Sequence, residues 1–383
     1  MRCFEFSSFW CCGSNSSKHS IPKKTKITTS NDDEEEEAIN SQNQPPQHSH
    51  IIQEPSSTSS GAAEEHNNNS LNPRSNLPQI FTYNELVAAT NNFSDFVKVG
   101  AFGYVFKGTL PNSNQVVIVK TVGETEYIVE THMLSILRHP NLITLFGHYS
   151  QWTARTHLLV YEFMPLDSLE DHLFDHFPRT RRPLDWNTRM KIALGVAKGL
   201  EFLHRGIGRR PVVHGDLKPS NILLGEGFHP KLSHFGIARF IPTWPTTSAN
   251  PSSTRQMDSI GYSAPEYIAT GKLSIKADIY SFGVVLLQLI TGNQAIVNRS
   301  HNGHIIWLCQ WVQAMMEDKD NLRYIADLSL FDEYPEDCLE HALALAGMCV
   351  KNEAEERLTM IEVVHHLEIL EANKYHSPNN DTM

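Results

Sequence analysis

The stretch from His214 to Leu224 holds the densest group of side chains that could carry out chemistry. It reads His-Gly-Asp-Leu-Lys-Pro-Ser-Asn-Ile-Leu-Leu and places Asp216, Lys218 and Asn221 within six positions. Their side chains carry a carboxylate, which accepts hydrogen bonds, an ammonium group, which donates them, and a carboxamide, which does both. Such groups are suited to reactions of polar substrates. The alternative is a buried polar loop without a catalytic role, and we favour the first interpretation.

The same stretch resembles the catalytic loop of protein kinases at every position but one. By this resemblance, Asp216 would accept the proton of a substrate hydroxyl, Lys218 would steady the transferred phosphoryl group and Asn221 would hold a metal ion. The cofactors of an active member would be ATP with magnesium or manganese. The exception is Gly215, which replaces an arginine, so we do not expect an arginine clamp on a phosphorylated activation loop.

Further kinase-like residues follow in the family's order. Lys120 lies on a predicted strand after a glycine-containing hairpin, and Glu130 lies on the next predicted helix. The resemblance implies an ion pair between them, although the ten residues that separate them require a short connection before the helix. It also implies that Arg357 pairs with Glu266 and that Asp278 anchors the large lobe. The implied nucleotide contacts are Lys98, Val99, Gly100, Gly103, Val105, Ile118, Lys120, Glu130, Glu162, Met164 and Leu223.

Three other motifs narrow the resemblance to plant receptor-like cytoplasmic kinases. They are Phe81–Leu86 with Ala89–Phe93, then Pro183–Trp186 and Lys276–Gly283. The resemblance covers residues 80 to about 372 and implies an α+β, two-lobed kinase fold. A small β-rich N-lobe would span about 94–163 and a large helical C-lobe about 164–372, within a domain of residues 79–372. An active member would be specific for Ser and Thr and would signal beside receptor kinases or intracellular immune receptors.

Hydrophobic patterning predicts the elements that position these residues. A short helix is expected over 81–92, and strands over 99–108 and 115–121 would form a hairpin. Helices are expected over 126–138 and 187–204. A helix over 277–290 is apolar nearly all round, which predicts a central, buried position, and further helices should run to about residue 372.

The largest departure from the family pattern is His234. The family's Asp-Phe-Gly reads His234-Phe235-Gly236 here, so the metal-binding carboxylate is replaced by an imidazole. Magnesium prefers oxygen ligands, and a protonated imidazole would repel it. We expect the loss of this metal ligand to cost several kcal/mol of transition-state stabilisation, and therefore orders of magnitude in rate.

Two more departures concern the nucleotide. Lys98 stands at the first position of the glycine-rich loop, which keeps only Gly100 and Gly103. We expect its bulk to hinder the approach of the backbone to phosphate, and the alternative is that Lys98 itself contacts phosphate. Ile118 replaces the small residue that covers the adenine, and overfilling of a packed site costs about 1–3 kcal/mol. These changes predict weak or absent nucleotide binding.

Residues 1–78 are rich in Ser, Asn, Gln, Pro, His and Glu and predict a disordered tail, and residues 373–383 predict a flexible C-terminus. Within the tail, residues 1–26 combine aromatic side chains, lysines and the cysteines Cys3, Cys11 and Cys12. This combination is typical of an S-acylated anchor at a membrane surface, while Arg2 excludes myristoylation. The alternative is a disordered terminus with incidental cysteines.

Composition excludes several classes of function. The net charge of −11 and pI near 6.0 show no basic footprint for nucleic acid. The six cysteines form no CxxC pair and no zinc-like spacing, and no apolar run is long enough to span a bilayer. We therefore expect an intracellular chain with reduced thiols.

These observations lead to two hypotheses. The first is a receptor-like cytoplasmic pseudokinase, which acts as an adaptor, allosteric partner or decoy in plant immune or developmental signalling. It would lie in the cytoplasm or at the cytoplasmic face of the plasma membrane, with receptor kinases, immune receptors and the inner membrane surface as partners. The second is an active Ser/Thr protein kinase with atypical metal use, such as manganese held by Asn221 and a neutral His234.

Overall fold

The computed structural model describes residues 77–100, 103–153, 155–174, 182–208, 210–241, 259–299 and 305–375. All of these residues belong to one compact unit. The predicted tail up to residue 76, with its anchor and its three cysteines, lies outside the described residues, as do residues 376–383. Among the described residues, no helix has the length and apolarity needed to cross a membrane.

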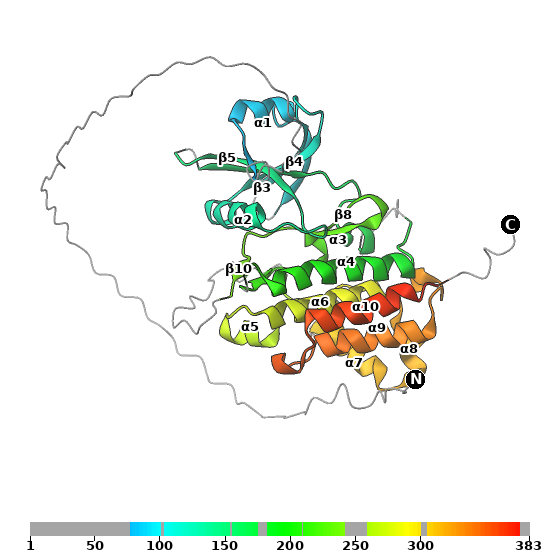
Figure 1. The fold of residues 1–383 in the computed structure, drawn as a ribbon. Helices are drawn as coiled ribbons and strands as arrows, with labels where there is room; N and C mark the ends of the chain where they lie inside the picture. Colours follow the sequence, from blue (N-terminus) through cyan, green and yellow to red (C-terminus); the bar gives the residue numbers. More distant parts are fainter. Residues whose placement is uncertain are drawn as a thin grey trace, which may run out of the picture. The chain divides into compact units, whose positions relative to one another are not determined.

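The small lobe is built on a six-stranded sheet in the order β1-β5-β6-β4-β3-β2 (Figure 1). All of its neighbouring strands are antiparallel except the pair of β1 and β5. The strands are β1 (Gln79–Ile80), β2 (Phe96–Gly100), β3 (Gly103–Thr109), β4 (Val116–Val122), β5 (Leu145–Gln151) and β6 (Thr156–Glu162). The helices α1 (Tyr83–Ala89) and α2 (Glu124–Ile136) complete the lobe.

Strand β4 shows how an alternating sequence directs its side chains to two different faces of the sheet. Its side chains alternate between two faces, so Val117 and Val119 are fully buried in the core beneath α1. Ile118 and Lys120 face the opposite side, toward the large lobe. The hairpin predicted between this strand and the one before it is confirmed as β3 and β4.

The single strand predicted over residues 99–108 is wrong, because the structure divides this segment into β2 and β3. The chain reverses direction between Gly100 and Gly103, which pair across the two strands. A Cβ atom on Gly103 would lie 2.0 Å from Thr121 Oγ1, so a side chain here would collide with β4. The alternating pattern of the segment did not reveal this turn.

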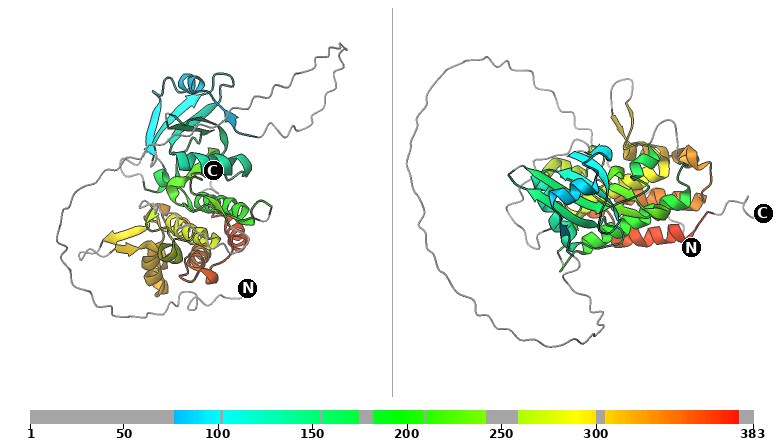
Figure 2. Two further views of the ribbon diagram at one scale, coloured as in Figure 1. Left: turned by 90° about the vertical axis from the view of Figure 1, so that its left-hand side faces the viewer. Right: turned by 90° about the horizontal axis from the view of Figure 1, so that it is seen from above.

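The large lobe is mainly helical and lies below the sheet of the small lobe in the left view of Figure 2. Its helices are α3 (Leu169–Leu173), α4 (Trp186–Arg205), α5 (Pro265–Thr270), α6 (Ile275–Thr291), α7 (Leu308–Met316), α8 (Leu322–Ile325), α9 (Glu336–Cys349) and α10 (Met360–Ala372). Short strand pairs join β7 (Val212–Val213) to β10 (Arg239–Phe240), β8 (Ile222–Leu224) to β9 (Pro230–Leu232), and β11 (Ile296–Arg299) to β12 (Ile305–Trp307). The predicted α+β, two-lobed fold is confirmed.

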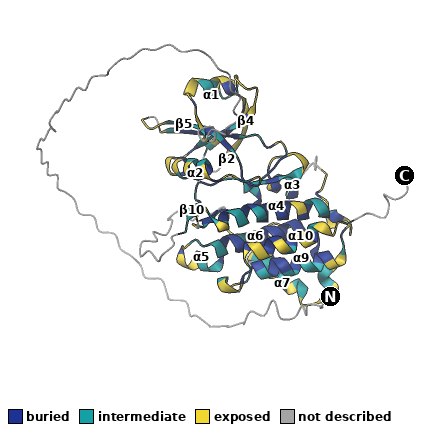
Figure 3. Ribbon diagram, in the orientation of Figure 1, coloured by how far each residue is buried: buried dark blue, intermediate teal, exposed yellow. Residues whose placement is uncertain are grey.

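Helix α6 is the central element of the large lobe, as the sequence predicts. Nearly all of its side chains are buried, and it packs against α4 and α9 (Figure 3). Ser274 caps its N-terminus, and Gly292 ends it in a left-handed conformation with φ of 65°. The predicted pair of Arg357 and Glu266 is also confirmed, with two guanidinium–carboxylate distances of 2.7 Å.

Candidate active site

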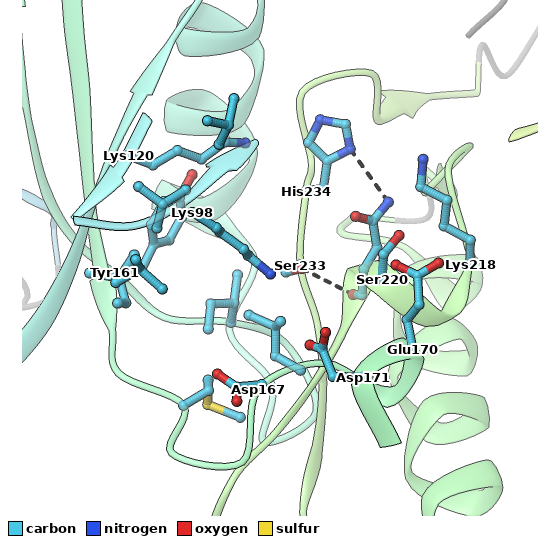
Figure 4. Close-up of a pocket in the computed structure, with 18 of the residues that line it drawn as sticks. Lys98, Lys120, Tyr161, Asp167, Glu170, Asp171, Lys218, Ser220, Ser233 and His234 are labelled. Atoms are coloured by element: carbon cyan, nitrogen blue, oxygen red, sulfur yellow. Dashed lines mark hydrogen bonds between the residues drawn. The ribbon is translucent and has the colours of Figure 1, made fainter. Parts of the chain in front are cut away.

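A cavity of about 710 Å³ lies between the two lobes (Figure 4). This volume is in the range typical of small-molecule sites. The predicted nucleotide contacts that line it are Lys98, Val99, Val105, Ile118, Lys120, Glu130, Glu162, Met164 and Leu223. Gly100 and Gly103 are not among its lining residues in the described part of the chain. The cavity therefore keeps a ligand-sized volume with Ile118 in its wall.

The predicted ion pair between Lys120 and Glu130 is wrong. Lys120 Nζ lies 2.8 Å from Glu126 Oε1. The reason is the short connection between β4 and α2, which brings the first turn of the helix beside Lys120. Glu130 lies one turn further along the same helix face, where it is buried and its Oε2 atom has no hydrogen-bond partner.

Asp278 positions the catalytic loop from the N-terminal turn of α6. Its buried carboxylate accepts hydrogen bonds from the backbone amides of His214 and Gly215, both at 2.8 Å, and contacts His204 Nε2 at 3.0 Å. The predicted anchoring role of Asp278 is therefore confirmed. Gly215 has φ of +81°, a left-handed conformation that favours glycine and would strain an arginine at this position.

Asp216 is buried and surrounded by hydrogen-bond donors. Its carboxylate accepts from Asn221 Nδ2 at 2.7 Å and from Ser259 Oγ at 2.5 Å, and Lys218 Nζ lies 3.6 Å away. Burial alone would raise the pKa of Asp216, but hydrogen bonds from His234 and Ser259 and the charges of Lys218 and His234 lower it well below its usual range. The structure thus brings the three predicted catalytic-loop residues together around an ionised carboxylate.

The His234 ring lies between two carboxylates. Its Nδ1 atom is 2.8 Å from Asp216 Oδ2, and its Nε2 atom is 3.2 Å from Glu126 Oε1. Because ionised carboxylates only accept hydrogen bonds, both ring nitrogens donate and the imidazole is protonated. Burial opposes this charge, but the hydrogen bonds to Asp216 and Glu126 outweigh it and raise the pKa of His234 to about 9.

These residues do not fit the magnesium site that the family fold implies. The His234 ring already occupies the space between the two carboxylates, and Asn221 Nδ2 lies 3.5 Å from its Nδ1 atom. The oxygen atoms that magnesium needs are thus occupied by a side-chain cation, which would repel a second one. Among the described residues, no group of three or more His, Cys, Asp or Glu side chains could hold a metal ion.

A pH-dependent stability follows from the position of His234. Since its pKa of about 9 in the folded protein is above the ordinary value of 6.5, its stabilising effect is fully present below pH 6.5 and is lost as the pH rises through 9. We expect the difference in unfolding free energy between the wild type and His234→Gln to shrink over this interval. Urea titrations at a series of pH values check this, and a difference that does not change with pH would contradict it.

Two residues of this site were not identified from the sequence, Glu126 and Ser259. Glu126 contacts both Lys120 and His234, and Ser259 donates to Asp216 from a position 43 residues further along the chain. For Glu126, a signal was present in the sequence, because it precedes Glu130 by one helical turn and the connection to α2 is short. For Ser259, the sequence carries no local signal.

Comparisons with known proteins agree with the two-lobed fold and the catalytic loop described above. The sequence model of the protein tyrosine and serine/threonine kinase family matches residues 92–367. Serine/threonine-protein kinase PBS1 of Arabidopsis thaliana is 47% identical over 323 residues, which cover 81% of this chain and 69% of the relative. Serine/threonine-protein kinase PBL27 of the same plant is 47% identical over 309 residues, covering 79% of this chain and 58% of the relative. Probable serine/threonine-protein kinase PBL21, also from Arabidopsis thaliana, is 46% identical over a match that covers 78% of this chain and 79% of the relative. The chain therefore belongs to the protein tyrosine and serine/threonine kinase family and, within it, to the receptor-like cytoplasmic serine/threonine kinases.

Proposed function

We propose that this chain is a receptor-like cytoplasmic kinase whose phosphotransfer is lost or severely impaired, and that it acts through its surfaces. It would serve as an adaptor, allosteric partner or decoy in plant immune or developmental signalling. The observation that carries this proposal is the position of the His234 ring between Asp216 and Glu126. This ring stands where an active member binds its metal.

The physical argument concerns the charge that develops during phosphoryl transfer. In active kinases, metal ions bridge the β- and γ-phosphates and neutralise this charge. The imidazolium of His234 is held by two carboxylates at 2.8 and 3.2 Å, so its charge is already balanced. It also offers no lone pair to a metal ion. Magnesium-bound ATP should therefore bind weakly, and any bound nucleotide should transfer its phosphate slowly.

The proposed location is the cytoplasmic face of the plasma membrane or the cytoplasm, with receptor kinases or intracellular immune receptors as partners. The support is the likeness to receptor-like cytoplasmic kinases and the sequence of the first 26 residues. We propose S-acylation of Cys3, Cys11 and Cys12 as the attachment to the inner membrane surface.

The second candidate is an active Ser/Thr protein kinase with atypical metal use. The names of the relatives favour it, because they are serine/threonine-protein kinases. So does the grouping of Lys218 and Asn221 around Asp216. This enzyme would need His234 to lose its proton and to leave Asp216, and it should prefer manganese, which accepts imidazole ligands more readily than magnesium does.

Phosphate transfer by the full-length protein decides between the two candidates. We expect no radiolabel to pass from ATP to a protein substrate with magnesium or with manganese beyond the level of the Asp216→Asn variant. Labelling that depends on Asp216 would contradict impaired phosphotransfer and support the second candidate.

A further inference from the structure

A second cavity lies in the large lobe, at the end that is farthest from the sheet of the small lobe (Figure 1). It has a volume of about 530 Å³ and is formed where the end of α6 meets α7, α8 and the turn of residues 328–331. Within the described part of the chain, it has no lining residue in common with the cavity between the lobes. It is therefore a separate site, to which phosphotransfer assigns no role.

Large apolar side chains are exposed around this second cavity. Among its lining residues, Tyr324 is 58% exposed, Leu328 is 86% exposed and Phe331 is 79% exposed. Trp311 lines it as well and is half-buried. Single exposed apolar residues are common on protein surfaces, but a group of them around a cavity indicates an interaction site.

The turn that carries Leu328 and Phe331 is held in place by the buried side chain of Arg189. This guanidinium donates to Asp327 Oδ2 at 2.7 Å and to Ser329 Oγ at 3.1 Å. Phe331 follows in a left-handed conformation with φ of 51°, which is unusual for an aromatic residue. The fold therefore presents two large apolar side chains to solvent from an anchored turn.

The surface around the second cavity is acidic. The sequence over 317–337 contains eight Asp or Glu residues and two Lys or Arg residues, a net charge of −6. Inclusion of Arg182, which precedes a lining residue, and of the buried Arg189 leaves a net charge of −4. Asp332 and Glu333 directly follow the turn and are exposed. An occupant with apolar side chains and positive charges nearby matches this surface.

The first 26 residues of the same chain have these two properties. They carry a net charge of +4, and four lysines over 18–26 follow the aromatic residues Phe4, Phe6, Phe9 and Trp10. This segment lies outside the described residues. The 50 residues from 27 to 76 that connect it to the described chain extend to at most about 170 Å, which exceeds the diameter of about 50 Å expected for a folded domain of this size. Because the segment belongs to the same chain, even weak contacts would hold it in the cavity.

We propose that the second cavity is a docking site for residues 3–10 of the same chain, with the lysines over 18–26 facing the acidic surface around it. Tyr324, Leu328 and Phe331 contact the aromatic side chains of this segment. Docking hides the aromatic side chains that the proposed membrane anchor needs, so the segment cannot lie in the cavity and in a bilayer at once. The large lobe thus competes with the membrane for the same segment.

Photocrosslinking of the full-length protein tests this docking. Phe331 is replaced by the photoreactive aromatic residue p-benzoylphenylalanine, and equal amounts of unlabelled and nitrogen-15-labelled chains are mixed before irradiation. We expect mass spectrometry to find residue 331 joined to the tryptic peptide of residues 3–18, with both partners from chains of the same isotopic composition. This result would show that each chain holds its own segment.

Two controls make the crosslink specific. The same photoreactive residue in place of Ile361, which is 56% exposed on α10 and does not line the second cavity in the described part of the chain, should not join to this peptide. Replacement of Phe4, Phe6, Phe9 and Trp10 by serine should lower the crosslink yield from position 331 at least about fivefold. Raising the salt concentration to about 1 M should lower it at least about threefold, because the attraction between the charges is screened.

Three results would overturn the proposal: no crosslink from position 331 to the peptide, a crosslink that joins chains of different isotopic composition, or a yield that the serine substitutions leave unchanged. Sedimentation of the wild type with vesicles that contain phosphatidylserine separates this docking from the proposed anchor. A wild type that does not sediment would overturn the anchor and leave the docking valid, whereas absence of the crosslink would overturn the docking and leave the anchor standing.

Discussion

The His234→Asp variant is expected to transfer phosphate at least about 100-fold faster than the wild type in the presence of magnesium. The substitution removes the ring that binds Asp216 and Glu126 and places a carboxylate beside Asn221. A hard divalent cation can then bind through oxygen atoms and offset the charge that develops on the transferred phosphoryl group. Initial rates with radiolabelled ATP and a protein substrate, for full-length proteins, measure the gain.

Two control variants make this expectation specific. His234→Asn removes the imidazole but supplies no negative charge, so it should gain far less activity than His234→Asp. Addition of Asp216→Asn to His234→Asp should abolish the gain, because the proton acceptor is lost. A His234→Asp variant as inactive as the wild type, although it binds ATP with magnesium, would show that the metal position does not limit the reaction.

The Arg357→Ala variant is expected to lose about 3–5 kcal/mol of folding free energy. The Arg357 side chain is fully buried and forms two hydrogen bonds of 2.7 Å with Glu266. It also donates to the backbone carbonyls of Lys276, Lys351 and Asn352. Its removal leaves a partly buried carboxylate and three backbone carbonyl groups in partly buried hydrogen bonds without their partner, which costs more than the loss of an exposed ion pair.

Chemical denaturation followed by tryptophan fluorescence measures this loss. Lys198→Ala is the matched control, because the pair of Lys198 and Glu368 has a similar N–O distance of 3.0 Å but side chains that are 40% and 52% exposed. We expect this control to change stability by less than about 1 kcal/mol. Equal effects of the two substitutions would contradict the structural role assigned to Arg357.

Much of the fold and part of the site could be predicted from the sequence, because the information is local. The catalytic loop is a continuous segment, so Asp216, Lys218 and Asn221 come together wherever that segment adopts its turn. The predicted central helix is found as α6, since a segment that is apolar on every side is stable only when it is buried. The replacement at His234 was also visible at once, because it interrupts a motif of fixed order.

The features that the sequence did not predict depend on which residues come close together when the chain folds. Whether Lys120 meets Glu126 or Glu130 is decided by where α2 begins after β4, and both glutamates lie on the same helix face. The turn between Gly100 and Gly103 is flanked by strand-favouring residues, Val99 before it and Tyr104 to Phe106 after it, so periodicity alone did not find it. The replacement of aspartate by His234 predicted the loss of a metal ligand. It could not show that the ring would bind two carboxylates at once.

The central claim is that a protonated His234 ring occupies the metal position. Nitrogen NMR of the histidine side chains tests it most directly, with His234→Gln used to assign the signals and spectra recorded near pH 7 with and without magnesium and ATP. We predict that both ring nitrogens of His234 carry protons and that magnesium does not change their signals. A neutral ring, or a signal that shifts when magnesium is added, would contradict the claim.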